Sequence, residues 1–300
     1  MLDWLLDPLQ YEFVRNAIAI GMIVGVICPV VGSYLIVLRM SLLGDVIAHA
    51  VMPGLAIANA LRIDLSIGAF ISGMCSTFVI AWIRQQSRVR VDAAMTLTFS
   101  TFFGLGIALI SLLKTQLDLE GFLFGDILNV TQGDLLHGVI VAVILLVLIK
   151  LHYKELLFYT FDPLGAEAAG LPTTWIHYSL MAGVTLAIVT SLKVVGVIMA
   201  IAMLVGPAIT AYLLVKELHM MMLVGAGLGV LAAIGGMYSS FYWDLPSGAA
   251  IALVIFGLFL MALLFSPSQG ILTRPRPKAT RPRSGKVAES AAPKPTADLD

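Results

Sequence analysis

The stretch from residue 247 to residue 266 reads SGAAIALVIFGLFLMALLFS and carries no charged side chain. A helix of about 20 apolar residues is long enough to cross the roughly 30 Å of hydrocarbon in a bilayer. A run of this length without a charge is therefore typical of a membrane-spanning helix. Similar runs recur along the chain, and the sequence predicts nine spans: 16–38, 41–60, 65–83, 93–113, 135–151, 174–192, 194–215, 220–241 and 247–266.

The composition of the 300 residues agrees with this interpretation. Hydrophobic residues make up 59% and charged residues 12%, whereas soluble domains average about 45–50% and about 25%. An ordinary soluble enzyme is therefore excluded. Backbone groups in lipid must satisfy one another's hydrogen bonds, and the runs do not alternate as barrel strands do, so the spans are expected to be helices. We predict an all-α, polytopic membrane protein of eight or nine transmembrane helices over residues 1–272.

The charges in the loops predict how the chain is oriented. Arg84, Arg88 and Arg90 crowd the loop after the third span, which should be cytoplasmic, whereas the acidic loop 114–134 should face outward. Nine spans satisfy both assignments and place the N-terminus outside; a broken or re-entrant early helix would reduce the count to eight and move it inside. Residues 273–300 are expected to form a disordered, basic cytoplasmic tail, without the aromatic residues that stack on nucleic-acid bases.

Asp45 and His49 are the ionisable pair that stands out, because charged residues inside a span are costly and usually mark function. They lie four residues apart in the second span and therefore share one helix face. A carboxylate and an imidazole together suit a divalent metal such as Mn²⁺, Fe²⁺ or Zn²⁺. Two ligands are too few for a tight site, but a twofold dimer would bring four together. The spacing alone favours the simpler alternative, in which the two side chains pair with each other inside the bundle.

Pro53 follows His49 by four residues in the same span. Its ring clashes with the carbonyl four residues back, so the helix is expected to kink beside His49 and to free that carbonyl. Val51, Met52 and the kink lie one turn beyond the histidine, on the predicted outer side. Apolar side chains from two copies could close an ion path there, and Met52 and Pro53 are therefore predicted to form a gate.

A second informative segment covers residues 161–172 on the predicted cytoplasmic side. It is too short to span the membrane, and an Asp-Pro and a Leu-Pro pair bracket it, so a short bounded helix is expected. Its small residues allow close backbone approach, and its glutamate offers a charge to a basic partner. An ordinary interfacial loop is the open alternative. The residues assigned to docking are Asp162, Pro163, Ala166, Glu167, Ala169, Gly170 and Pro172.

Two sequence motifs of enzymes are missing. The chain has no G-x-x-x-x-G-K-[ST] motif, so it cannot hydrolyse ATP through a P-loop, and it has no H-E-x-x-H motif of a zinc protease. It is therefore not expected to be an enzyme. A secondary transporter that uses Asp45 and His49 as a proton or cation relay stays open as the alternative function.

The block from Gly44 to Gly54, GDVIAHAVMPG, resembles the signature of the metal-type ABC permeases, the family that imports manganese, zinc or iron. Members of that family carry the same D-x-x-x-H-x-x-x-P-G pattern in an early membrane helix. The segment 161–172 resembles the family's cytoplasmic coupling segment, and the external loop with Gly125-Asp126-Ile127-Leu128 is also similar. The resemblance runs from about residue 10 to residue 266.

This resemblance implies a homodimeric permease of a type II-like ABC importer in the cell (inner) membrane. It implies that a separate cytoplasmic ATPase docks on segment 161–172 and that an extracytoplasmic solute-binding protein delivers the ion. Asp45 and His49 would contact the translocating metal, which passes through the protein and is not a permanently bound cofactor. Two carboxylates and two imidazoles suit Mn²⁺ and do not exclude Zn²⁺, so manganese is favoured over zinc or iron.

Overall fold

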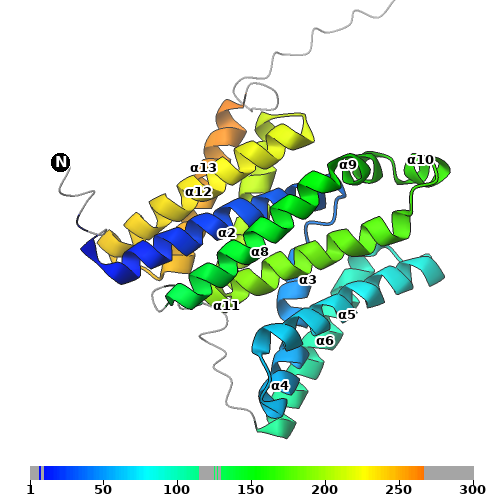
Figure 1. The fold of residues 1–300 in the computed structure, drawn as a ribbon, viewed down its shortest axis with the longest axis horizontal. Helices are drawn as coiled ribbons and strands as arrows, with labels where there is room; N and C mark the ends of the chain where they lie inside the picture. The colour runs from blue at the N-terminus through cyan, green and yellow to red at the C-terminus, as the bar shows by residue number, and fades with distance from the viewer. Residues whose placement is uncertain (1–6, 8–9, 115–124, 126, 128–129, 267–300) are drawn as a thin grey trace, which may run out of the picture.

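The computed structural model describes residues 7, 10–114, 125, 127 and 130–266, so the predicted tail 273–300 lies outside the described residues. The long elements in this part of the chain are all α-helices (Figure 1). In chain order they are α2 (Glu12–Val37), α3 (Leu43–Ala50), α4 (Met52–Leu61), α5 (Leu65–Gln86), α6 (Val91–Leu113), α8 (Gln132–Leu151), α9 (Tyr153–Phe161), α10 (Pro163–Ala168), α11 (Thr173–Leu214), α12 (Leu218–Trp243) and α13 (Ser247–Phe265).

Eight helical stretches among the described residues are long and apolar enough to cross a membrane, which confirms the all-α polytopic fold. One of them, Leu43–Leu61, combines α3 and α4. Another, α11, has 42 residues and bends at Gly196, whose φ of 75° lies outside the helical region. The parts on either side of Gly196 correspond to the predicted spans 174–192 and 194–215. Each part approaches the length of about 20 residues that a crossing needs.

The helices form two groups, with α3 between them (Figure 1). In the first group α2 packs along α11 and α12, and α13 packs on both of these. Gly25 of α2 and Gly229 of α12 face each other so closely that a Cβ atom on either would overlap the other's backbone. In the second group α4, α5 and α6 pack together, and Gly54 and Gly68 make the same kind of approach. Small residues commonly allow membrane helices to pack this closely.

The two ends of the bundle carry different charges. Arg39, Arg84 and Arg90 gather near one end, and Arg84 also lines a pocket there with residues of α9 and α10. At the other end Lys193 Nζ lies 3.2 Å from Asp134 Oδ1. The arginines therefore distinguish one end of the bundle from the other.

The predicted external loop is anchored at the bend of α11. Gly125 adopts a φ of 72° and lies against the backbone of Val195 and Gly196, where a Cβ atom would have no room. Ile127 is buried nearby in the core. Asp126 and Leu128 of the same motif lie outside the described residues. Glycine is required here both by the left-handed backbone and by the close approach.

Candidate metal site and cytoplasmic docking segment

Asp45 and His49 share one face of α3, as their spacing predicts. His49 Nε2 lies 3.6 Å from Asp45 Oδ1, and the side chain of Asp45 is 47% exposed whereas that of His49 is 18% exposed. The contact is longer than an ordinary hydrogen bond. The pair therefore leaves the carboxylate oxygens largely free to bind something else.

Two phenylalanines of α6 hold the imidazole of His49. The ring centroids of Phe99 and Phe103 lie 5.1 and 5.4 Å from that of His49, and both rings meet it edge to face. Their own rings stack with centroids 5.9 Å apart. Sequence reasoning missed this contact, although the F-x-x-x-F spacing in the predicted span 93–113 places both rings on one helix face.

The two nitrogens of His49 have different surroundings. Nε2 faces Asp45, whereas Nδ1 is buried and has no hydrogen-bond partner within the described part of the chain. A metal bound between the two side chains would therefore be ligated by Nε2 and by a carboxylate oxygen. The buried Nδ1 and the flanking rings restrict the imidazole to this presentation.

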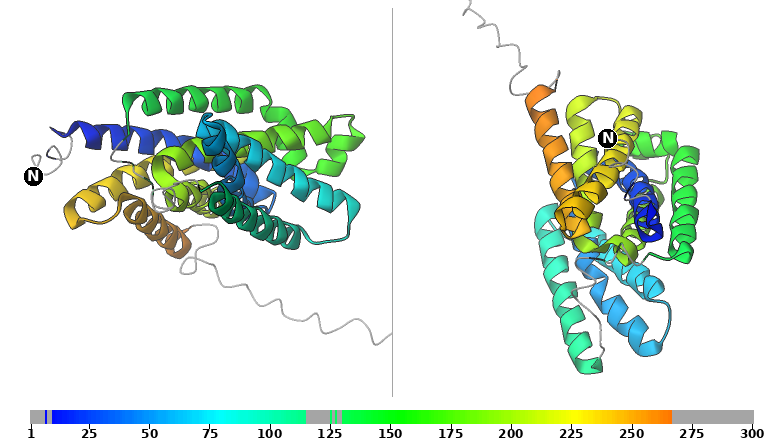
Figure 2. Two further views of the ribbon diagram at one scale, coloured as in Figure 1. Left: turned by 90° about the horizontal axis from the view of Figure 1, so that it is seen from below. Right: turned by 90° about the vertical axis from the view of Figure 1, so that its left-hand side faces the viewer.

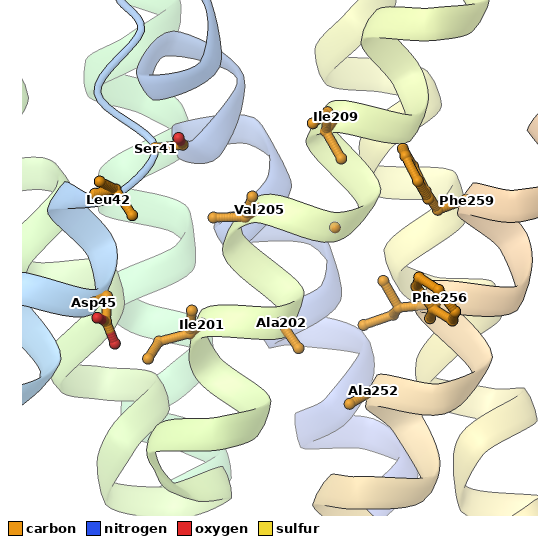
Figure 3. A pocket seen from close by; sticks show the side chains of 12 residues that line it. Ser41, Leu42, Asp45, Ile201, Ala202, Val205, Ile209, Ala252, Phe256 and Phe259 are labelled. Atoms are coloured by element: carbon orange, nitrogen blue, oxygen red, sulfur yellow. The ribbon is translucent and has the colours of Figure 1, made fainter. Parts of the chain in front are cut away.

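Asp45 opens onto a groove of about 470 Å³ between α3, the second part of α11 and α13 (Figure 3). Asp45 and Ile201 lie at one end of this groove and the rings of Phe256 and Phe259 lie at the other. Only Ser41 and Asp45 among its lining residues carry polar side chains. A half-exposed carboxylate on so apolar a surface is costly in a membrane unless a cation or a partner meets it.

The helix breaks beside His49, as Pro53 predicts. α3 ends at Ala50 and α4 begins at Met52, with Pro53 in its first turn. The Ser72 hydroxyl of α5 donates a 2.6 Å hydrogen bond to the carbonyl oxygen of Ala50 at this break. Sequence reasoning could not single out Ser72, which is one of several small polar residues in an otherwise apolar span.

Met52 and Pro53, the residues predicted to form a gate, lie against α6 in this conformation, and the gate stays a prediction. Both residues are buried, and Met52 is only 4% exposed. Met52 packs against Gly106 of α6, where a Cβ atom would lie 2.5 Å from the Met52 Cβ. In this conformation a second copy of the chain therefore cannot reach either side chain. Helix α4 carries one polar side chain, Asn59, and for that reason its pattern did not reveal which face meets α6.

One chain alone supplies an incomplete metal site. No group of three or more His, Cys, Asp or Glu side chains among the described residues is placed to hold a metal ion. Asp45 and His49 provide one oxygen and one nitrogen ligand, and most metals of this class take four or more. The missing ligands must come from water, a second copy of the chain or another protein.

Residues 161–172 contain the short helix that the two prolines predict. Asp162 begins α10, and its Oδ1 accepts a hydrogen bond of 2.9 Å from the N–H of Gly165. At the other end Gly170, with a φ of 82°, closes the helix: its N–H donates to Glu167 and the N–H of Leu171 donates to Ala166. These paired bonds form a Schellman motif, in which glycine is the preferred residue. Helix α10 is thus fixed at both ends.

The residues predicted to dock on a partner differ in how exposed they are. Glu167, Ala169 and Gly170 are exposed, and so is Leu164 in the first turn of α10. Ala166 is wholly buried against its own chain, so the prediction that it faces a partner is corrected. A small residue suits close packing on either side of a helix, and its identity alone could not show which side it faces.

A polar pocket of about 260 Å³ adjoins this helix. The hydroxyl of Tyr159 lies 2.8 Å from His177 Nδ1, and Arg84 lines the same pocket. Burial raises the pKa of Tyr159, although the charge of Arg84 opposes the shift. The phenol is therefore protonated at neutral pH, and its hydroxyl is hydrogen-bonded to His177 Nδ1. This hydrogen bond connects α9 to α11 next to α10.

The profile of the family described as "ABC 3 transport family" matches residues 10–266. The "Manganese transport system membrane protein MntC" of Listeria monocytogenes is 43% identical over 264 residues, which are 88% of this chain and 94% of the relative. A "Probable iron transport system membrane protein" of Haemophilus influenzae is 38% identical over 266 residues, which are 89% and 98% of the two chains. The solved structure described as "PsaBC from Streptococcus pneumoniae in complex with Fab" superposes with a TM-score of 0.81 at 37% identity and covers 90% of this chain and 98% of that one.

Proposed function

The chain belongs to the ABC 3 transport family, and we propose that it is the permease of an importer that carries a divalent transition metal, manganese before zinc or iron, into the cell. The observation that carries this proposal is the pair of Asp45 and His49. They meet at 3.6 Å on one helix face inside a predicted membrane span, with the carboxylate half-exposed. Intramembrane ionisable residues commonly mark an ion pathway.

The ion path is proposed to run between two copies of the chain. Within the described part of the chain Asp45 and His49 are the two ligands found together, and Asp45 opens onto an apolar groove that a second membrane-embedded chain could cover. A twofold axis through this region would bring two carboxylates and two imidazoles together. The repulsion between the two carboxylates would be relieved by the divalent cation, so the site would be most stable when metal is present.

Manganese is the favoured cargo for two reasons. The relative in Listeria monocytogenes is named as a manganese transport protein, although the one in Haemophilus influenzae is named for iron. The proposed ligand set of two oxygens and two nitrogens is harder than the thiolate-rich sets that zinc and copper(I) prefer. Helix α3 itself contains no cysteine and no methionine.

Helix α10 is proposed to dock on a separate cytoplasmic ATPase. It lies at the end of the bundle where arginines gather, which the positive-inside rule identifies as cytoplasmic. The chain lacks a P-loop, so the ATPase must be another protein. A helix capped at both ends can carry a rigid-body displacement from the ATPase to α9 and α11. An extracytoplasmic solute-binding protein would deliver the metal to the opposite face.

The proposal is tested by uptake of radioactive Mn²⁺ into cells that depend on this transporter. Asp45→Asn keeps the shape of the side chain and removes its charge, so uptake should fall more than tenfold while the protein still inserts in the membrane. The matched control is Asp244→Asn. Asp244 is exposed and ends α12 with a φ of 51°, which asparagine also tolerates. Normal uptake by well-expressed Asp45→Asn protein would contradict the assignment.

A further inference from the structure

A second apolar groove, of about 510 Å³, lies along α8, beside α11 and the first turns of α5. Helix α8 follows the flank of the molecule in both views of Figure 2 and exposes apolar side chains along its length, so this groove faces lipid. Leu145, Gly183, Phe70 and Leu186 are among the apolar residues that line it. It shares no lining residue with the groove at Asp45.

The polar groups of this groove gather at one end. His152 Nδ1 lies 2.8 Å from Glu155 Oε2, and both side chains are about half-exposed. Trp175, in the first turn of α11, is exposed at the same end. Tryptophan is enriched where a membrane meets water. The hydroxyl of Ser179 also lines the groove but already donates to the carbonyl of Ile176.

The length of the groove matches one leaflet of a bilayer. From Trp175 to Leu186 the axis of α11 advances about 16 Å at the helical rise of about 1.5 Å per residue. Half of the roughly 30 Å hydrocarbon core is about 15 Å. A molecule with an apolar chain of this length and a polar head would therefore place its head at His152 and Glu155.

Gly183 leaves open space beside Leu145 in the lining of the groove. A Cβ atom built at this position would meet only the side chain of Leu145, at an ordinary contact distance of 3.5 Å. The backbone there is helical, so no unusual conformation requires glycine. A larger side chain would therefore be accommodated by the fold but would fill the groove.

We propose that this groove binds an acyl chain of a cytoplasmic-leaflet phospholipid whose headgroup carries a primary ammonium, as in phosphatidylethanolamine. The ammonium donates hydrogen bonds to the carboxylate of Glu155, and the phosphate meets His152. Phosphatidylcholine has the same charges but no N–H to donate, and phosphatidylglycerol has no cation for Glu155. The leaflet follows from the proposed orientation of the chain, whereas the binding itself is independent of metal transport.

The experiment is native mass spectrometry of the purified full-length permease, with its ATPase where the two co-purify. The probes are dioleoyl phosphatidylethanolamine, phosphatidylcholine and phosphatidylglycerol, which differ only in the head. Phosphatidylethanolamine should saturate one site per chain at a concentration about tenfold lower than the other two, the change expected for one charge-assisted hydrogen bond. Glu155→Gln should remove this preference, whereas the acyl chains of all three lipids should still bind in the groove.

Gly183→Leu should abolish the saturable site for all three lipids. Its matched control is Gly227→Leu, because Gly227 is exposed on α12 with open space around it and lies outside the groove. Equal binding of the three lipids, or a preference unchanged in Glu155→Gln, would overturn the proposal and indicate lipid of the general annulus. Retention of the site in Gly183→Leu, or a dimer in which no lipid binds because the second copy covers the groove, would overturn it as well. If Gly183→Leu fails to fold, the comparison of wild type with Glu155→Gln still decides.

Discussion

The hydroxyl of Ser72 donates a 2.6 Å hydrogen bond to the carbonyl oxygen of Ala50, where the chain passes from α3 to α4. Pro53 has no N–H and is placed to interrupt the helical bonds of this turn. Ser72 thus ties the break next to His49 to the middle of α5. The sequence predicts the break between α3 and α4. It does not predict that Ser72 donates a hydrogen bond to the carbonyl oxygen at this break.

Ser72→Ala should therefore destabilise the protein and reduce metal uptake. The variant leaves a buried carbonyl without its donor, which costs about 1–3 kcal/mol, and it loosens the turn that positions His49. Thermal unfolding of the purified protein and uptake of Mn²⁺ are the two measurements. Ser76→Ala is the control, because the Ser76 hydroxyl bonds only to the Gly73 carbonyl of its own helix. Equal effects of the two variants would show that Ser72 has no special part in the break.

Phe103→Leu should weaken metal binding and leave the fold intact. The ring of Phe103 meets the His49 imidazole edge to face at 5.4 Å. Losing such a contact removes roughly 0.5–1.5 kcal/mol, so the affinity for Mn²⁺ should fall by about two- to tenfold. Isothermal titration of the purified protein measures this. Phe102→Leu is the control on the same helix, since Phe102 is not one of the two rings held against His49. An unchanged affinity in Phe103→Leu would mean that the rings only fill space.

Ala169→Trp should uncouple the permease from its ATPase. Ala169 is exposed beside Glu167 at the end of α10, where an indole would block a closely fitting partner. Gly170→Trp is a poorer test, because the left-handed backbone at Gly170 would be strained by any bulky residue. The readouts are co-purification of the ATPase and uptake of Mn²⁺ in the same preparation.

The control for this variant is Ala60→Trp, an exposed alanine near the end of α4, far from α10. It should co-purify with the ATPase as the wild type does. Co-purification and uptake at wild-type levels in Ala169→Trp would show that residues 162–172 form only an interfacial loop.

Orthovanadate should stop uptake of Mn²⁺ by the complete transporter in sealed vesicles. The chain has no P-loop, and the proposed function has its ion path driven through the ATPase that α10 is proposed to engage. A secondary transporter would continue to work on an ion gradient alone. Uptake that resists vanadate and collapses with a protonophore would favour that alternative.

The features that the sequence predicted correctly are those written in local patterns. Apolar runs locate the helices, the spacing of Asp45 and His49 places both on one face, and Pro53 marks the break of α3 from α4. Pro163 likewise marks the start of α10, and Pro172 lies beyond its end, which Gly170 closes. Each of these conclusions depends on residues within one or two helical turns of each other, for which spacing and backbone restrictions are sufficient.

The features that were missed depend on which faces of distant helices meet. Met52 of α4 is buried against Gly106, and the Phe99 and Phe103 rings contact His49, yet only Asn59 among the residues of α4 carries a polar side chain. A helix without a polar face gives no sign of its orientation. Gly196 is a similar case, because the bend of α11 depends on a backbone φ of 75° that one glycine among several could adopt.

We propose that two copies of the chain share one metal ion through Asp45 and His49. Equilibrium dialysis of the purified transporter against ⁵⁴Mn²⁺, with the protein concentration determined by amino-acid analysis, measures this stoichiometry. One tightly bound Mn²⁺ is expected for every two permease chains and none in Asp45→Asn or His49→Ala, while Asp244→Asn should bind as the wild type does. One ion for each chain, or tight binding that persists in both site variants, would contradict it.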